Sequence, residues 1–580
     1  MRPLYFGSPG HYGVLYEAPA GETTGRGVLL CAPLGREGVG SHRPLRSLAQ
    51  RLAAGGRPTL QFDWPGYGES LGDAGDLGLV PAMLRAVPAA LHELRLRSGV
   101  TDVTVVGVGS GALLAAAALA HHTPQADELV LWGAPRTGRT YLRELRAFQG
   151  LTTDGVSAAH ATATLPPGAM EASGFLVTQE TADGLAAIDL AEISLPAVSR
   201  ILLLDCAGDA RLADALGRSG SSVEIARTGG IQMLLEPPGV SLLDEAAAET
   251  IAGWLGAGAP QRHAAGLPPA VLEGSGWTEE VVAIDGPAGT MLATVARPHE
   301  LRTDAWVLLL NAGAVRRSGP NRLWTRWARS WAAAGVPSLR LDATGIGDSD
   351  GADVHARTLE TMCTRELVTD VQAAVRYTRD VLGAPRVVPV GLCSGAFAAY
   401  RAAVHEPSVT GAVMMNLQTT EWDRGEWERD LAQHARRSVR RRGVVRSVRR
   451  LRNTGLQTLA GATRGQLAEM RARLAISRRT SVHALPESSA AGLREELRRL
   501  RQRDVDMLFV FSSGDLGITY VTRRLGSLDA LEGELGARLA VIDGPDHTFR
   551  PLWSHGVLRQ AVESHLALLG VLEPAPGDAV

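Results

Sequence analysis

The chain of 580 residues contains no lysine, so all 59 of its Lys+Arg residues are arginine. This absence excludes chemistry that needs an ε-amine, such as Schiff-base formation or a phosphate-binding loop that ends in lysine. The four cysteines are far apart in the sequence and lack the close spacing of a zinc site. We therefore expect no metal site, no cofactor and no disulfide, as in a reduced, cytoplasmic protein.

Long apolar runs are absent too, and none approaches the roughly 20 residues that span a bilayer. Residues 1–10 lack the basic start and apolar centre of a signal peptide. The net charge of −2 gives no general electrostatic case for nucleic-acid binding. The composition, with 45% hydrophobic and 21% charged residues, is typical of a globular protein. We expect no membrane span and no nucleic-acid partner, in a chain long enough for two domains.

The chain contains an internal repeat of strand and helix patterns. Each copy has an apolar run, then a helical stretch, then a second strand that ends in an Asp-x-x-Gly-x-Gly turn. A further helix leads to a third strand closed by a Gly-rich turn. These segments occur at 28–35, 62–70 and 103–112, and again at 306–314, 339–351 and 387–396.

Strands that alternate with helices predict an α/β fold with mostly parallel sheets flanked by helices. The strands are continuously apolar, as expected where both faces of a sheet are buried. We interpret the repeat as one fold duplicated, a single large irregular domain being the alternative. The predicted organisation is a first domain at 1–258, a linker at 259–275, a second domain at 276–572 and a tail at 573–580.

The Gly-rich turns have the spacing Gly-x-nucleophile-x-Gly of a strand-turn-helix device that presents a strained nucleophile at the C-terminal edge of a sheet. The glycines are needed because a side chain would collide with the neighbouring strand or helix. In the second copy, the sequence GLCSG places Cys393 in the nucleophile position. In the first copy, the sequence GVGSG places Gly109 there, and Ser110 lies one place late, where it would point into the fold and offer only its backbone.

A nucleophile needs a base, and the base needs a group that orients it. Downstream of Cys393, one apolar strand ends at Asp515 and the next leads to His547. Both residues follow the carboxyl ends of strands, where open α/β sheets place their sites. We predict Asp515 as the acid and His547 as the base, with Asp543 and Asp546 as alternative acids.

The corresponding positions of the first copy lack a base. Asp209 is a candidate acid there, but the base position falls on Ile231 or Gln232, neither of which accepts a proton from a nucleophile. With glycine as the nucleophile residue, two of the three roles are missing. We therefore predict that the first domain is catalytically inert.

Each of these residues also has a purely structural interpretation. Cys393 could be a small buried hydrophobe, His547 a surface histidine and Asp515 a turn residue. For Cys363, within the helical pattern LETMCTRELV, we expect a place in the core. Asp63 and Asp342, the aspartates of the repeated turn, are expected to stabilise that turn and to take no part in catalysis.

These residues resemble the α/β-hydrolase superfamily. The Phe-Asp-x-x-Gly-x-Gly-x-Ser turn, the Gly-x-Cys-x-Gly elbow and the Gly-x-Asp-His-Thr-Phe stretch are most similar to its serine-aminopeptidase-like branch. The resemblance covers nearly the whole chain, so that it implies two such units in tandem. The roles that it implies are Cys393 as nucleophile, Asp515 as acid, His547 as base, and the backbone amides of Ser394 and of either Gly313 or Ala314 as oxyanion donors.

The branch normally has serine where this chain has Cys393. Cysteine there is similar to dienelactone hydrolases, polyhydroxyalkanoate synthases and certain acyl-shuttling enzymes of peptide and polyketide assembly lines. A thiolate is both a strong nucleophile and a good leaving group, so thioesters and activated esters are its natural acyl donors. We favour acyl transfer or thioester cleavage on a small acyl substrate. Hydrolysis of a small ester or lactone is one alternative, and a non-catalytic binding scaffold is another.

An insertion at about 417–504 is helical in pattern and rich in arginine. The resemblance implies a lid over the second domain here, since many α/β-hydrolases insert one in this region. Its basic face has two main interpretations, a solvated lid surface or a docking face for an acidic acyl carrier protein. RNA or an anionic membrane surface is a further alternative. Aromatic residues suited to base stacking are sparse apart from Trp422 and Trp427, which argues against single-stranded RNA. Homo-oligomerisation is left open.

Overall fold

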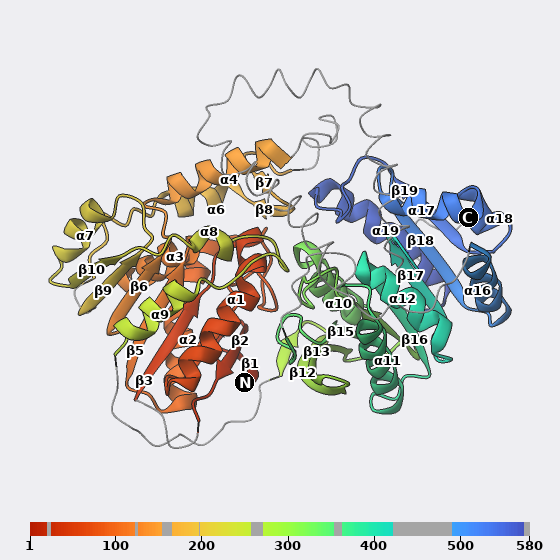
Figure 1. The fold of residues 1–580 in the computed structure, drawn as a ribbon, viewed down its shortest axis with the longest axis horizontal. Helices are drawn as coiled ribbons and strands as arrows, with labels where there is room; N and C mark the ends of the chain where they lie inside the picture. The colour runs from red at the N-terminus through yellow and green to blue at the C-terminus, as the bar shows by residue number, and fades with distance from the viewer. Residues whose placement is uncertain are drawn as a thin grey trace. The chain divides into compact units, whose positions relative to one another are not determined.

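The computed structural model describes residues 1–19, 25–121, 126–152, 165–195, 198–256, 271–352, 362–420 and 490–573 (Figure 1). They form two compact units. The first unit comprises Met1–Thr152 and Leu165–Glu273, and the second runs from Gly274 onward. Among the described residues, every helix is too short or too polar to cross a bilayer.

The first unit is built on a sheet that is antiparallel at one edge and parallel elsewhere. Its middle strands are buried on both faces, which explains why they are continuously apolar in sequence. In spatial order the strands are β1 (Arg2–Phe6), β2 (His11–Tyr16), β4 (Thr59–Phe62), β3 (Arg26–Cys31), β5 (Asp102–Val108), β6 (Glu128–Trp132), β9 (Arg200–Leu204) and β10 (Ser222–Ala226).

Helices connect the parallel strands of this sheet, and a short hairpin of β7 (Met170–Ala172) and β8 (Phe175–Val177) lies outside it. Helices α2 and α3 pack against each other and contribute most of their apolar side chains to one core. The helices are α1 (Gly35–Ala54), α2 (Leu79–Ser98), α3 (Ser110–His121), α4 (Gly138–Thr152), α6 (Gln179–Ala186), α7 (Asp209–Gly217), α8 (Ile231–Leu234) and α9 (Glu245–Trp254).

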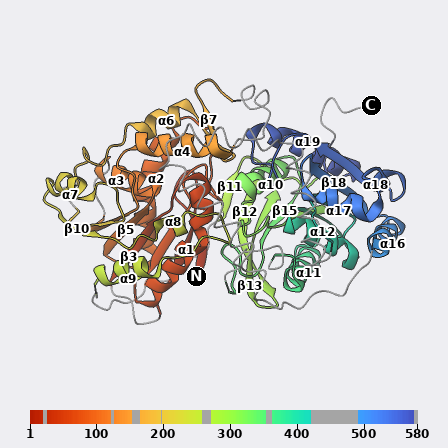
Figure 2. The same cartoon turned by 45° about the horizontal axis from the view of Figure 1, so that its top comes forward.

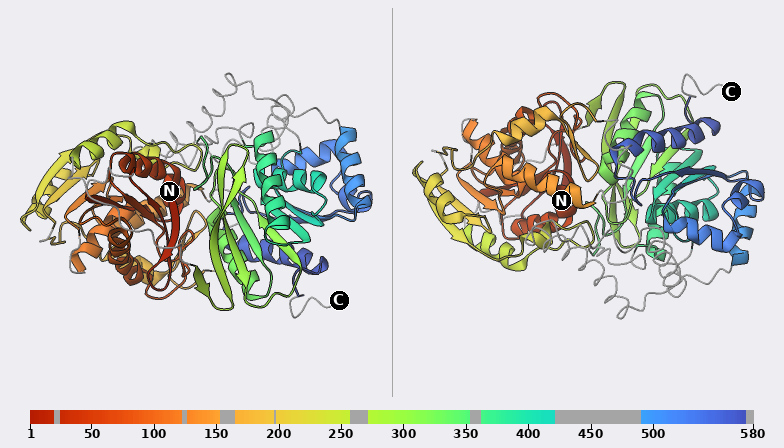
Figure 3. Two further views of the ribbon diagram at one scale, coloured as in Figure 1. Left: turned by 90° about the horizontal axis from the view of Figure 1, so that it is seen from below. Right: turned by 90° about the horizontal axis from the view of Figure 1, so that it is seen from above.

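The second unit has a sheet with the same strand order and directions, extended by β11 at the antiparallel edge. The long antiparallel pair β12 and β13 is light green in Figure 3. In spatial order the strands are β11 (Leu272–Gly274), β12 (Trp277–Gly286), β13 (Gly289–Pro298), β15 (Ser338–Asp342), β14 (Ala305–Leu309), β16 (Arg386–Leu392), β17 (Gly411–Met415), β18 (Asp506–Ser512) and β19 (Arg538–Ile542).

Helices cover the second sheet on both faces (Figure 2). Helices α10 and α19 lie side by side, and Trp331 Nε1 of α10 donates a hydrogen bond to Glu563 of α19 at 2.8 Å. Helices α11, α12 and α16 belong to a core on the other face. The helices are η1 (Pro320–Arg322), α10 (Leu323–Ala333), α11 (Arg365–Asp380), α12 (Ser394–His405), α16 (Ala490–Gln502), α17 (Leu516–Leu525), α18 (Asp529–Gly533) and α19 (Leu552–Leu568). The predicted α/β class, with parallel-rich sheets flanked by helices, is confirmed.

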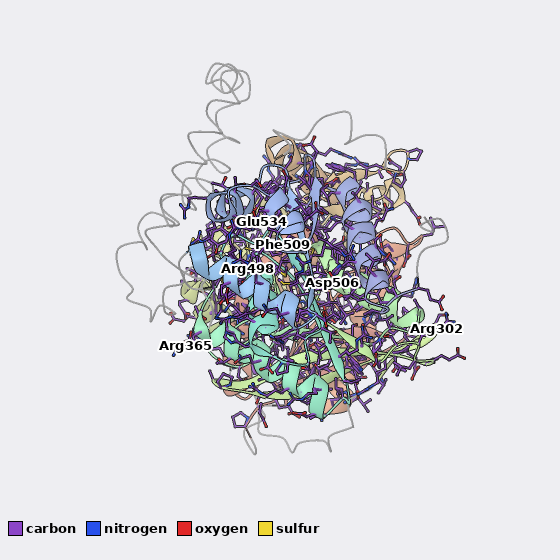
Figure 4. All side chains as sticks on the ribbon, turned by 90° about the vertical axis from the view of Figure 1, so that its right-hand side faces the viewer. Arg302, Arg365, Arg498, Asp506, Phe509 and Glu534 are labelled. Carbon is purple, nitrogen blue, oxygen red and sulfur yellow. The ribbon has the colours of Figure 1, made fainter. Side chains whose placement is uncertain are left out.

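Three predicted boundaries need correction. The lid was expected to extend to 504, but α16 is a core helix that buries Leu493, Leu497 and Leu500 against the sheet. Figure 4 labels Arg498 on the exposed side of this helix and the buried Phe509 of β18.

The expected linker at 259–275 ends too late, since its last part forms β11, which pairs in the second sheet. The expected tail at 573–580 begins too early, because Glu573 still accepts a hydrogen bond from Arg302 at 3.2 Å. Most of the Arg-rich insertion, at 421–489, lies outside the described residues, as do 257–270 and 574–580.

The repeated Asp-x-x-Gly-x-Gly turn has the same construction in both units. The Asp63 carboxylate accepts from the backbone N–H of Glu69 at 2.8 Å, and Asp342 accepts from that of Asp348 at 3.2 Å. Six residues separate donor and acceptor in each case, so the carboxylate closes the turn that follows the strand. Both aspartates therefore stabilise the turn, as predicted.

In the second unit the turn also holds a buried ion pair. Arg317 Nη1 lies 2.5 Å from Asp342 Oδ2 and 2.9 Å from Asp348 Oδ2, and all three side chains are fully buried. Removing one partner of such a cluster leaves a charge in the interior without its full compensation. The cluster therefore fixes the loop after β14, next to which the candidate site is built.

We expect Asp342→Ala to lower the free energy of unfolding of the second unit by about 3–5 kcal/mol, because Arg317 loses a buried partner. Urea denaturation of the full chain measures this change. Asp304→Ala is the matched control, since Asp304 pairs with Arg386 at 3.0 Å on the surface, where its side chain is 58% exposed. That variant should lose at most about 1 kcal/mol. Equal effects of the two variants would contradict the assignment.

Candidate active site

Cys393 lies between β16 and α12 in a strained backbone conformation. Its φ of 59° and ψ of −118° are unusual for a residue with a side chain. Its N–H donates to the carbonyl of Met415 on the neighbouring strand at 3.0 Å, which holds the turn against the sheet. Strain of this kind persists where the surrounding structure imposes it, and it often marks functional positions.

The glycines on either side of Cys393 are required by contacts with neighbouring backbone. A Cβ on Gly391 would lie 2.0 Å from the carbonyl oxygen of Gly395, and a Cβ on Gly395 would lie 2.6 Å from that of Asn311. Both distances are far below van der Waals contact. The sequence pattern thus reflects a tight strand-to-helix turn, for the steric reason expected from the sequence.

Exposure distinguishes Cys393 from the other cysteines. Cys31, Cys206 and Cys363 are buried, whereas Cys393 is partly exposed. Burial raises the pKa of Cys206 to about 11 and that of Cys363 well above its ordinary value, so these thiols stay protonated and unreactive. Cys363 belongs to the core, as predicted, although it precedes α11 and is not part of a helix.

Asp515 caps the first turn of α17 and contacts His547. One carboxylate oxygen accepts the N–H of Gly517 at 2.7 Å, and the other lies 2.5 Å from Nδ1 of His547. The side chain of Asp515 is almost fully buried. Because the capping bond fixes this carboxylate, the carboxylate in turn can fix the orientation of the imidazole.

The imidazole of His547 is held between two acidic groups. Burial alone would lower its pKa, but the negative charges of Asp515 and Cys393, together with a side-chain hydrogen bond to each, raise the pKa well above 6.5. Since both interactions favour the imidazolium, the histidine is suited to stabilise a neighbouring thiolate. The structure thus brings the three residues predicted from the sequence into one connected group.

The two alternative acids are engaged elsewhere. Asp543 accepts a hydrogen bond from Ser513 Oγ at 2.6 Å. Asp546 accepts from the N–H of Arg550 at 2.9 Å and pairs with its guanidinium. Of the three candidate carboxylates, Asp515 is therefore the one that contacts the imidazole.

Asn416 also supports the site, although no sequence motif predicted it. This fully buried residue directly follows β17 with a φ of 49°. Its side chain donates to the carbonyl of His547 at 2.7 Å and accepts from the N–H of Ser512 at 2.8 Å. It therefore ties the loop that carries the base to the end of the strand before the acid. An asparagine directly after a buried strand was the available signal, because asparagine tolerates this conformation better than most residues.

Gln418 lies against the acid and the base. Its Nε2 is 3.1 Å from Nδ1 of His547 and 3.5 Å from Oδ2 of Asp515. Because the hydrogen on Nδ1 is directed at Asp515, the amide is placed to donate to the carboxylate. No motif in the sequence indicated this residue, since it approaches the site only through the fold.

The amide of Gly313 is already in use. It donates to the side-chain oxygen of Ser394 at 3.0 Å, which disfavours Gly313 as the oxyanion donor named by the resemblance. Within the described part of the chain, the amides of Ser394 and Ala314 have no hydrogen-bond acceptor. Ala314 is therefore the better candidate of the two loop residues, with Ser394 at the start of α12 as the second donor.

The first unit has the same backbone turn without a nucleophile. Gly109 has a φ of 54°, and its N–H donates to Trp132 in the way that Cys393 donates in the second unit. Ser110 is buried, as expected, but its hydroxyl also takes part, because it accepts from the N–H of Leu34 at 2.8 Å. Ser110 therefore points into the fold, as predicted, and its hydroxyl has a structural contact there.

The positions of the acid and base in the first unit have other contacts. Asp209 pairs with Arg227 and accepts the N–H of Ala210 at 2.9 Å. Ile231 is buried, and Gln232 is exposed. These residues form no arrangement for moving a proton.

No protein-family model and no curated protein sequence matches the chain. Similar solved structures include an esterase of Pyrococcus furiosus, with 13% identity over 50% of this chain and 93% of that chain and a TM-score of 0.33. A dienelactone hydrolase from Anabaena variabilis has 14% identity over 51% of this chain and 100% of that chain, with a TM-score of 0.31. A puromycin-hydrolyzing peptidase of Mycobacterium tuberculosis has 14% identity over 53% of this chain and 42% of that chain, with a TM-score of 0.33.

Proposed function

We propose that the chain consists of two tandem α/β-hydrolase units, and that the second transfers or cleaves acyl thioesters through an acyl-Cys393 intermediate. In this proposal His547 is the base, Asp515 orients it, and the first unit has no catalytic chemistry. The matching strand order of the two sheets supports the tandem arrangement. The proposal depends above all on the continuous contact from the Asp515 carboxylate through the His547 imidazole to the Cys393 thiol.

The reaction begins when the Cys393 thiolate attacks the carbonyl carbon of the acyl donor. The resulting oxyanion is stabilised by the amides of Ser394 and Ala314, and one such donor is typically worth about 2.7–4 kcal/mol. The bond to the leaving thiol then breaks, and the imidazolium of His547 gives its proton to the departing thiolate. An acyl group is left on Cys393 as a thioester.

The second half of the reaction reverses these steps with an acceptor. His547 takes the proton of the acceptor's hydroxyl, thiol or amine as that group attacks the acyl-Cys393 carbonyl. The Cys393 thiolate then leaves, and His547 is protonated again. Because the intermediate is itself a thioester, it stays reactive enough to acylate an acceptor. This reactivity favours acyl transfer as the function, and it argues against the cleavage of stable amides. With water as the acceptor, the same steps give hydrolysis of a thioester, a small ester or a lactone.

A shared intermediate predicts a product ratio that does not depend on the donor. S-butyryl-N-acetylcysteamine and p-nitrophenyl butyrate should divide their acyl groups between water and an added acceptor, such as ethanolamine, in the same proportion. Both donors give the same butyryl-Cys393, so the leaving group cannot influence the later step. Chromatographic measurement of butyrate and N-butyryl-ethanolamine determines the ratio.

A ratio that changes with the donor would contradict the common acyl-Cys393 intermediate. Exclusive formation of butyrate from both donors, whatever the acceptor, would favour hydrolysis over transfer. The Cys393→Ala chain serves as the blank in each reaction, since it lacks the sulfur and should keep the fold.

A further inference from the structure

The first unit keeps the backbone of a nucleophile elbow but has no side chain at its tip. A Cβ on Gly109 would meet Pro33 at 3.5 Å and the Glu37 Oε2 atom at 3.8 Å, both ordinary contact distances. The space that a nucleophile would occupy is therefore not filled by closer packing. A carboxylate faces it instead.

Glu37 has unusual surroundings for an acidic residue. It lies in the first turn of α1, and within the described part of the chain its carboxyl group has no hydrogen-bond or ion-pair partner. Glu37 is partly exposed, but its partial burial raises the pKa of the carboxyl group, and the charge of Glu144 raises it further. Arg36, its neighbour in sequence, offers only partial compensation, because its guanidinium lies 4.4 Å over the ring of Phe148 and donates to a backbone carbonyl.

Aromatic and hydroxyl groups lie in the same part of the first unit. The Tyr141 ring is buried, and its hydroxyl interacts with Ser110, the residue next to Gly109. The partly exposed rings of Tyr67 and Phe175 stack with centroids 6.1 Å apart. Phe175 would also contact a Cβ at Gly35, two residues before Glu37. We call Gly109, Ser110, Glu37, Tyr141, Tyr67 and Phe175 the Gly109 cluster.

We propose that the Gly109 cluster binds a small organic ammonium ion in place of the lost nucleophile. The ammonium group would donate hydrogen bonds to the carboxylate of Glu37, and the rings of Tyr67 and Phe175 would contact its apolar part. The carboxylates of Glu37 and Glu144 determine the charge of the ligand. They repel an anion, and a neutral molecule would not reduce the repulsion between them. Aromatic faces attract cations as well.

Calorimetric titration of the full chain with benzylammonium tests this proposal, with benzyl alcohol and benzoate as neutral and anionic analogues. Benzylammonium should bind about tenfold or more tightly than benzyl alcohol, and benzoate should not bind. Glu37→Gln should weaken benzylammonium binding by about tenfold or more. Tyr67→Leu should weaken it by about two- to fivefold.

Two control variants locate the binding site. Glu192→Gln changes an exposed carboxylate elsewhere in the first unit and should leave the affinity unchanged. Cys393→Ala should also leave it unchanged, so the result does not depend on the function of the second unit. The proposal is overturned if benzylammonium does not bind, if benzyl alcohol binds equally well, if folded Glu37→Gln binds like the wild type, or if Cys393→Ala abolishes binding. Circular dichroism and thermal melting establish that each variant is folded.

Discussion

Replacing Cys393 with alanine should lower the turnover of S-butyryl-N-acetylcysteamine by about 10⁴-fold or more, the scale seen when a covalent nucleophile is removed. The sulfur is the group to which the acyl chain is attached, and neither His547 nor the oxyanion amides can replace it. Initial rates of thiol release measure the effect. Because the side chain of Cys393 is partly exposed and small, its removal leaves little cavity, and the fold should persist.

Cys206→Ala is the matched control for this experiment. It removes a thiol of the first unit that is buried and donates to the carbonyl of Leu131 at 3.1 Å. Turnover should then remain within about twofold of the wild type, because that thiol stays protonated. If Cys393→Ala retained wild-type turnover while Cys206→Ala lost it, the assignment of the nucleophile would be wrong.

Asp515→Asn should lower turnover by about 10⁴-fold, as found when the orienting carboxylate of a catalytic triad becomes an amide. The removed charge is one of the two that raise the pKa of His547, so this pKa should fall. NMR titration of the imidazole measures that second effect. The capping bond to Gly517 gives the variant a built-in check, because asparagine also caps helices and should keep α17 in place.

Asp543→Asn is the control that shows whether turnover falls because Asp515 is the acid or because any nearby negative charge is lost. Asp543 follows β19 near His547 in sequence, but its carboxylate contacts Ser513. We expect turnover and the pKa of His547 to change little in this variant. A larger loss of turnover in Asp543→Asn than in Asp515→Asn would show that Asp543 is the acid and Asp515 is not.

The elements that position the nucleophile could be predicted because backbone sterics leave few alternatives. Gly391 and Gly395 are glycines for reasons of contact with neighbouring backbone, and such contacts produce a fixed spacing in the sequence. Asp515 and His547 were found in a similar way, since each follows a buried strand and the carboxyl ends of parallel strands share one edge. Their common position at that edge is enough to predict that the two side chains meet.

Other parts of the site depend on contacts between residues far apart in the chain. Asn416 and Gln418 reach His547 across about 130 residues, and no local pattern records that approach. Either Gly313 or Ala314 was a candidate oxyanion donor, but the N–H of Gly313 donates to the hydroxyl of Ser394 in the neighbouring turn. Ser394 was considered for its backbone amide alone, so the consequence of its side chain was not foreseen.

The boundaries of the insertion could not be predicted from charge. Helix α16 has arginine and glutamate on its exposed side, so its composition resembles that of the basic segment before it. Its leucines at 493, 497 and 500 repeat at helical spacing and enter the core of the second unit. That apolar periodicity was a better guide to its place than the count of arginines. The lid and the docking of an acidic carrier protein at 421–489 remain predictions.

Intact-mass spectrometry of the full chain gives the most direct test of the proposed chemistry. After brief exposure to S-butyryl-N-acetylcysteamine and quenching in acid, the wild-type chain should gain the mass of one butyryl group. Peptide mapping should locate that group on Cys393, and the Cys393→Ala chain should gain none. A wild-type chain that turns over the donor without acylation, or that carries the acyl group on another residue, would contradict the covalent role of Cys393.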